Sequence, residues 1–104
     1  MPGAEAVFAA LGDPTRLALL RRLSARGPAS ISSLSRGFDL TRQGVTKHLN
    51  VLAGAGIVTG RRQGREHVWA VRPERLDEAQ RYLRVIARGW DEALARLKAH
   101  VEKG

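Results

Sequence analysis

The pattern of hydrophobic and polar positions is clearest across residues 41–58, TRQGVTKHLNVLAGAGIV. Apolar residues recur there at i, i+4 and i+7, so they share one face of a helix. These residues are Val45, Leu49 and Leu52. The opposite face carries side chains that can hydrogen-bond to base edges and phosphates, namely Gln43, Thr46, Lys47 and Asn50. With Thr41 as N-cap and Gly56 as the stop, the pattern predicts a helix over 41–55 with one face on a core.

Two helices are predicted near the N-terminus. Residues 4–11 form a short apolar helix that ends at Gly12. The Asp13-Pro14 pair then opens a second helix, because Asp accepts hydrogen bonds from the free N–H groups and Pro lacks an N–H of its own. We expect this second helix to turn three leucines inward, Leu17, Leu20 and Leu23.

A third, short helix is predicted from its N-cap Ser30 to Arg36, and it buries Ile31 and Leu34. Residues 37–40 form a tight turn from this helix into the helix at 41–55. Two short helices joined by such a turn, the second with a polar outer face, form a helix-turn-helix.

Residues 58–71 predict a β-hairpin. Gln63-Gly64 is a turn signal between two extended runs, and the second run places Trp69 and Val71 on one face. Three arginines gather near the turn, Arg61, Arg62 and Arg65. Such charges are often only solvated, but directly after a helix-turn-helix they favour a wing that grips DNA phosphates.

The remainder of the chain, residues 74–102, predicts one long helix. Its apolar residues recur at intervals of three and four, close to a coiled-coil seam. They are Leu76, Ala79, Leu83, Ile86, Trp90, Leu94, Leu97 and Val101. The helix is roughly 40 Å long at 1.5 Å per residue and should overhang the domain. We therefore expect a homodimer whose interface contains Val7, Phe8, Leu11, Ile86, Trp90, Leu94, Leu97 and Val101.

Composition limits the possible partners and compartments. The 104 residues include 18 Lys and Arg against 10 Asp and Glu, a formal net charge of +8. This balance favours a polyanionic partner, either nucleic acid or an anionic membrane surface. The absence of cysteine excludes disulfides and thiolate metal sites. Without a signal-peptide or membrane-spanning pattern, we expect a single domain over 1–104 in the cytoplasm, without a membrane partner.

Three stretches in order carry a family resemblance: LGDPTRLALLRRL, LTRQGVTKHLNVLAGAGIV and RRQGREHVWAVRP. The chain resembles the ArsR/SmtB family of bacterial winged helix-turn-helix repressors over most of its length. The resemblance implies a mainly α fold with a small β-hairpin wing, in the order α-α-α-α-β-β-α, dimerising through the terminal helices. It also implies a recognition helix in each major groove and a wing on the flanking backbone, in a bacterial protein that associates with the nucleoid through DNA. The DNA-binding residues that it implies are Arg42, Gln43, Thr46, Lys47, His48, Arg61, Arg62 and Arg65.

The family is also known for metal sensing, from which this sequence departs. The thiolate metal box of the family needs cysteines, and the zinc site on its terminal helices needs a spacing that Asp91, His100 and Glu102 lack. We therefore expect no metal site and no cofactor. The operator, the regulated genes and any small-molecule inducer stay unknown.

Three other classes of function fit the sequence less well. An enzyme is disfavoured, because no nucleophile–base set, phosphate-binding loop or paired carboxylates appear. A membrane-surface helix is disfavoured because acidic residues offset the arginines of the long helix. A winged helix that serves only as a protein-interaction module, with nonspecific DNA affinity, remains the alternative to a sequence-specific homodimeric repressor.

Overall fold

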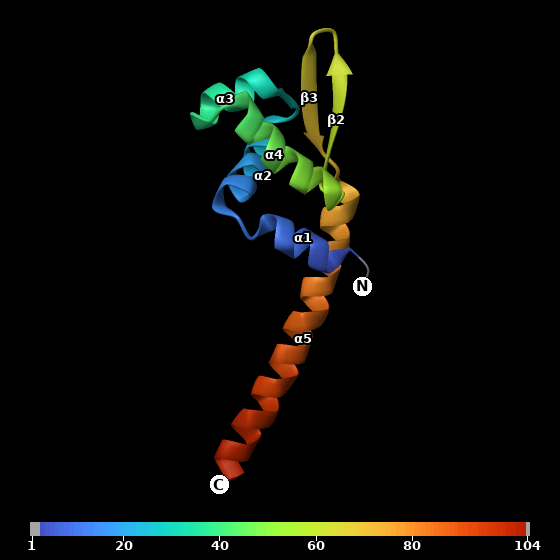
Figure 1. Cartoon of the computed structure of the whole chain (residues 1–104). Helices are drawn as coiled ribbons and strands as arrows, with labels where there is room; N and C mark the ends of the chain where they lie inside the picture. Colours follow the sequence, from blue (N-terminus) through green and yellow to red (C-terminus); the bar gives the residue numbers. More distant parts are fainter. Residues whose placement is uncertain (1–2, 104) are drawn as a thin grey trace.

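The computed structural model describes residues 3–103, and within them five helices and three strands follow one another along the chain (Figure 1). The helices are α1 (Ala4–Leu11), α2 (Pro14–Arg26), α3 (Ile31–Phe38), α4 (Arg42–Gly54) and α5 (Pro73–Lys103). The strands are β1 (Ala29–Ser30), β2 (Val58–Gln63) and β3 (Glu66–Val71). The fold is the predicted winged helix-turn-helix, with β1 as an additional short strand.

Side-chain caps set the beginnings of three helices. The Asp13 carboxylate accepts from the backbone N–H of Arg16 at 2.9 Å, at the start of α2. Ser30 caps α3 and Thr41 caps α4 in the same way, at 3.1 and 2.9 Å. Each cap satisfies an N–H group that the helix itself leaves unpaired.

The end of α4 depends on Gly56, which has a φ of 78°. The N–H of Ile57 donates to the Leu52 carbonyl at 3.0 Å, and the N–H of Gly56 donates to Ala53 at 2.9 Å. This pair of bonds is a Schellman motif, which needs one residue with a left-handed backbone conformation. Glycine adopts that conformation without steric cost. The motif turns the chain sharply from α4 into β2.

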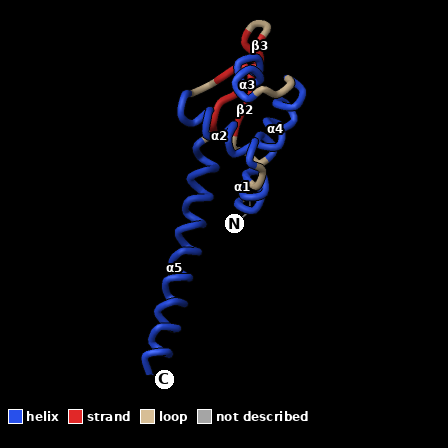
Figure 2. Tube along the Cα trace, turned by 90° about the vertical axis from the view of Figure 1, so that its left-hand side faces the viewer, coloured by secondary structure: helices blue, strands red, loops and turns tan. Residues whose placement is uncertain are grey.

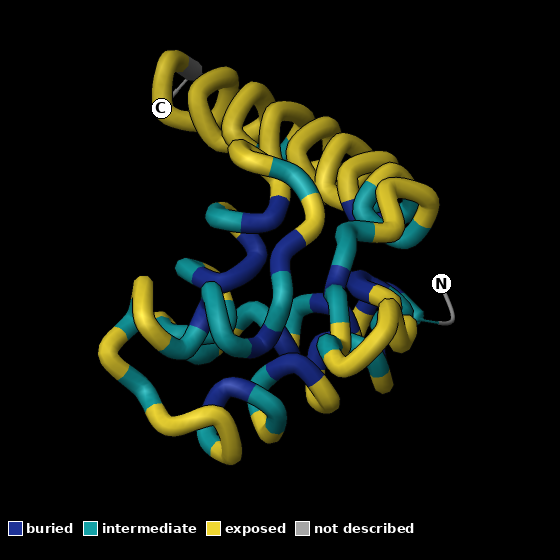
Figure 3. The backbone as a smooth tube through the Cα atoms, turned by 90° about the horizontal axis from the view of Figure 1, so that it is seen from above, coloured by how far each residue is buried: buried dark blue, intermediate teal, exposed yellow. Residues whose placement is uncertain are grey.

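The core lies where α2, α3 and α4 meet the inner face of the sheet. The buried segments gather in the compact part of the chain, whereas the long C-terminal helix is exposed along most of its length (Figure 3). Val45, Leu49 and Leu52 are all fully buried, as the helical pattern predicted. In α2 the prediction was wrong for Leu17, which is 37% exposed, whereas Leu19 is fully buried. The buried leucines Leu19, Leu20 and Leu23 lie within about 100° of one another around the helix, and Leu17 lies outside that sector.

The three strands form an antiparallel sheet in the order β1-β3-β2 (Figure 2). β2 and β3 are the predicted hairpin, with Gln63 opposite Glu66 across the turn. β1 is only two residues long and pairs with Val68 and Trp69 of β3. Trp69 is 4% exposed and faces the core. The sheet therefore fixes the hairpin to the helices at its base, and the turn projects away from them.

Helix α5 extends far beyond the rest of the chain (Figures 1 and 2). The molecule measures 68 × 25 × 20 Å and its radius of gyration is 18.4 Å, compared with about 13 Å for a compact chain of this length. Only the first turns of α5 contact the core, through Leu76 and the buried Ala79. Among residues 3–103, no helix combines the length and the apolar character that a membrane crossing requires.

Helix α1 packs beside the upper part of α5. The ring centroids of Phe8 and Tyr82 are 6.1 Å apart, and Phe8 and Leu11 are partly buried against the core. Val7 is fully buried within the chain itself. The prediction that Val7 contacts a second chain was therefore wrong, because its side chain has no surface left to present.

Candidate nucleic-acid interface

The outer face of α4 is polar and exposed. Gln43, Lys47 and Asn50 lie opposite the buried Val45 and Leu49, and all three are exposed. At about 100° per residue they cluster within roughly 60° of one another. Amide and ammonium groups gathered in this way can hydrogen-bond to base edges in a major groove, which admits a helix. Asn50 belongs to this group although the sequence resemblance did not assign it a role.

Thr46 lies on one flank of this face, next to Arg42. Its hydroxyl donates to the backbone carbonyl of Arg42 at 2.7 Å, one turn earlier. Because the hydroxyl proton is used within the helix, Thr46 presents a methyl group and the oxygen lone pairs outward. These groups suit apolar contact with a thymine methyl or acceptance from an exocyclic amine.

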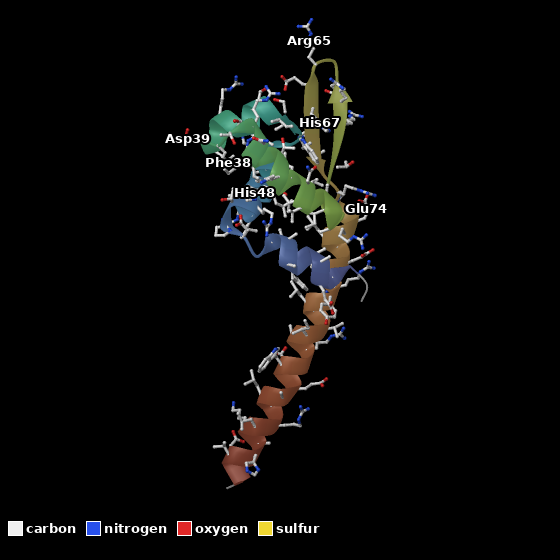
Figure 4. All side chains as sticks on the ribbon, in the orientation of Figure 1. Phe38, Asp39, His48, Arg65, His67 and Glu74 are labelled. Carbon is white, nitrogen blue, oxygen red and sulfur yellow. The ribbon has the colours of Figure 1, made fainter. Side chains whose placement is uncertain are left out.

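His48 lies on the other flank of α4, toward α2 (Figure 4). Its Nδ1 is 3.9 Å from Oδ2 of Asp13, the residue that caps α2. The pKa of Asp13 is lowered, mainly because its carboxylate accepts from the Arg16 N–H; desolvation opposes this shift, and the charges of Arg16 and His48 add to it. His48 thus faces a protein carboxylate, and its approach to a phosphate stays a prediction.

The three wing arginines do not share one face. Successive side chains of a strand alternate in direction, so Arg62 points to the same side as its partner His67, and Arg61 to the same side as Val68. Arg62 and Arg65 line a hollow of about 290 Å³ together with Arg42 of α4, Glu66 and His67. Arg61 instead lines the opposite side of the hairpin, with Val68 and Ala70. The structure therefore brings two of the three wing arginines together with the start of α4.

A short hydrogen-bonded chain links this hollow to α3. Nη1 of Arg42 donates to the Ser32 hydroxyl oxygen at 3.0 Å, and that hydroxyl donates to Oε1 of Glu66 at 3.2 Å. The three residues come from α4, α3 and β3, so their side chains connect the helix-turn-helix to the wing. No sequence pattern indicated Ser32 or Glu66, because 34 residues separate them.

We expect Arg62→Ala to weaken binding to every duplex by a similar factor and to lower the salt slope by about 1, since one phosphate contact is lost. Arg61→Ala is the matched control, because it removes the same charge from the other side of the hairpin. It should have a clearly smaller effect in the same salt titration. Equal losses for the two variants, or a loss for Arg62→Ala that is confined to certain bases, would contradict this geometry.

No group of three or more His, Asp or Glu side chains within residues 3–103 is arranged to hold a metal ion. The candidate ligands Asp91 and His100 both lie on the projecting part of α5, nine positions apart and exposed. The candidate functional site of the described residues is therefore the polar face of α4 together with the basic hollow beside it.

Several known proteins are similar to this chain in sequence and in fold. Residues 11–61 match a family described as a helix-turn-helix domain. The chain is 37% identical over 94 residues to the uncharacterized HTH-type transcriptional regulator YuzN of Bacillus subtilis, covering 85% of this chain and 95% of YuzN. It is 32% identical over 60 residues to the arsenical resistance operon repressor of the same organism, covering 58% of this chain and 57% of that repressor. The solved structure of an ArsR-like transcriptional regulator from Rhodococcus sp. RHA1 superposes with a TM-score of 0.79 at 38% identity, covering 92% and 90% of the two chains.

Proposed function

The chain belongs to the ArsR family of winged helix-turn-helix transcriptional regulators, and we propose that it is a homodimeric repressor that binds an inverted-repeat operator without a metal-sensing site. Regulators of this family bind DNA and are not enzymes. The observation that carries the proposal is the polar outer face of α4 directly beside the hollow lined by three arginines. A helix of this kind reads a major groove while the basic wing grips the flanking backbone.

The homodimer rests on the projecting part of α5. Six large apolar side chains are exposed along α5 within a sector of about 80° around the helix; they are Leu83, Ile86, Trp90, Leu94, Leu97 and Val101, at 51, 39, 65, 57, 59 and 67% exposure. The sector continues the face that packs Leu76 and Ala79 on the core. Monomers rarely expose a contiguous apolar patch of this length. We infer that the stripe packs against the same stripe of a second copy, with Phe8 and Leu11 beside its upper end.

A two-fold symmetric dimer implies a two-fold symmetric operator. Each α4 would enter one major groove, so the two half-sites should lie about one helical turn, or ~34 Å, apart on one face of the duplex. Within each half-site we assign base contacts to Gln43, Thr46 and Lys47 and backbone contacts to Arg42, Arg62 and Arg65. The functional test is a footprint on DNA upstream of the protein's own coding sequence, with excess nonspecific competitor.

The expected footprint has two-fold symmetry and survives the competitor. It should be the same with a chelator or with added Zn²⁺, since the sequence holds no cysteine and the metal ligands that the family uses are missing. Binding that disappears with competitor on this DNA and on a pool of random duplexes would leave only nonspecific attraction, as a protein-interaction module with a basic surface would give.

We expect Gln43→Ala and Lys47→Ala to relax base preference, each costing about 1–3 kcal/mol at the contacted base pair. The measurement is affinity for the footprinted operator and for single-base variants of it. Arg88→Ala is the control for the loss of a positive charge, because Arg88 is exposed on α5 away from the apolar stripe. If both α4 variants kept the wild-type base preferences, the assigned reading face would be wrong.

A further inference from the structure

A carboxylate lies inside the basic surface that would meet DNA. Glu66 is the first residue of β3, next to Arg65 at the turn, and it lines the same hollow as Arg42 and Arg62. Its Oε1 accepts from Ser32 at 3.2 Å. Its Oε2 is covered from solvent and, within the described part of the chain, has no hydrogen-bond partner.

This carboxylate has two opposite effects on DNA binding. It repels any phosphate that approaches the three arginines, because like charges at short range raise the energy of the complex. It also anchors Ser32, whose hydroxyl oxygen accepts from Arg42 at 3.0 Å at the beginning of α4. The repulsion of phosphate weakens binding to all DNA alike. The link through Ser32 instead fixes the position of the Arg42 side chain, which lies at the end of α4 that would enter the groove.

Nonspecific binding depends almost entirely on phosphate contacts. A group can lower the attraction of phosphates and also hold the reading helix in place. Such a group reduces the affinity for nonspecific DNA more than the affinity for the operator. Specificity is a difference between two affinities, and an element that weakens the wrong complex increases it. Glu66 has the position and the charge for this role.

We propose that Glu66 is a specificity-determining residue, which offsets part of the positive charge of the wing and positions Arg42 through Ser32. This inference rests on the proposed DNA-binding function and adds how the operator is distinguished from other DNA. A purely structural role, in which Glu66 only ties β3 to α3, would affect binding to all duplexes in the same proportion.

The test is Glu66→Gln compared with Glu74→Gln. Glutamine keeps the size of the side chain and an oxygen that can still accept from Ser32, so the variant removes the charge and preserves the link. Glu74 is exposed at the start of α5, at the other end of the hairpin from Arg65 (Figure 4), and its replacement gives the same change in net charge. Affinities are measured for the operator and for a scrambled duplex of equal length at several salt concentrations.

We expect Glu66→Gln, which keeps the link to Arg42, to raise affinity for the scrambled duplex and for the operator by a similar factor of about five to ten, because a charge that repels phosphate is lost. Glu66→Ala, which removes the charge and the link together, should raise affinity for the scrambled duplex by more than affinity for the operator. Glu74→Gln should leave both affinities close to those of the wild type. Ser32→Ala, which keeps the carboxylate but cuts the link to Arg42, should lower operator affinity more than affinity for the scrambled duplex, because backbone contacts fix the register on which base reading depends.

Identical results for Glu66→Gln and Glu74→Gln would overturn the inference, and so would an unchanged ratio of the two affinities in Glu66→Ala. In either case salt-dependent binding of the operator by the wild type would leave the proposed function standing. A wild-type protein that bound neither duplex in a salt-dependent way would overturn the proposed function and this inference together.

Discussion

Trp90→Ala should shift the protein from dimer to monomer and reduce operator affinity by about 10²–10⁴, the factor gained when two linked sites bind together. Trp90 is 65% exposed in the single chain and lies in the middle of the apolar stripe of α5. A central tryptophan in an interface contributes about 2–4 kcal/mol, and two-fold symmetry would place two of them in this one. Sedimentation velocity over a range of concentrations measures the dimer, and an operator titration measures DNA affinity.

Val85→Ala is the matched control for this prediction. Val85 is also apolar and 57% exposed, but it lies on the side of α5 opposite the stripe. It should leave both the dimer and operator affinity close to those of the wild type. A Trp90→Ala protein that sediments as the wild type does at all concentrations would show that this stripe does not hold the dimer together.

The features that were predictable from the sequence are those decided by neighbouring residues. The caps Asp13, Ser30 and Thr41 each act on an N–H group three residues ahead, so a short stretch of sequence contains the whole interaction. The same holds for the left-handed Asp39 in the turn before α4, with a φ of 51°. Local chemistry of this kind needs no knowledge of the tertiary fold.

The buried faces of short helices were harder to predict, because several faces satisfy the helical period. In α2, Leu17 and Leu19 both fit with Leu20 and Leu23, and only packing against the other helices selects Leu19. In α1 the buried face consists of Ala4, Val7 and Ala10, whereas the larger Phe8 lies at its edge. Two of these three buried residues are alanines, so the size of the side chains does not indicate which face of α1 is buried.

The exposed polar face of α4 was predictable from the sequence, whereas the contacts between α4 and the other elements were not. The alternation of strand residues already separates Arg61 from Arg62, so that distinction was available from the sequence. The contact of Ser32 with Glu66 was not, because it depends on how β1 pairs with β3, and a strand of two residues leaves no pattern. The hollow beside α4 follows from that pairing.

Leu49→Ala should destabilise the fold by about 2–5 kcal/mol, because it opens a cavity in a well-packed core. Leu49 is fully buried at the centre of the inner face of α4, so the cavity lies directly beneath the helix that carries Gln43 and Lys47. Since small domains have only about 5–15 kcal/mol of stability in total, the loss should lower the denaturant midpoint strongly. Operator affinity should fall as well, because α4 would lose its fixed position against the core.

The matched control removes the same atoms from an exposed leucine. Leu17→Ala, at a position that is 37% exposed, should cost less than about 1 kcal/mol, as surface substitutions do. Urea unfolding of the two variants beside the wild type measures both values. Similar midpoints for the two variants would mean that α4 does not rest on a tightly packed core, and the base contacts assigned to its outer face would then lack a rigid support.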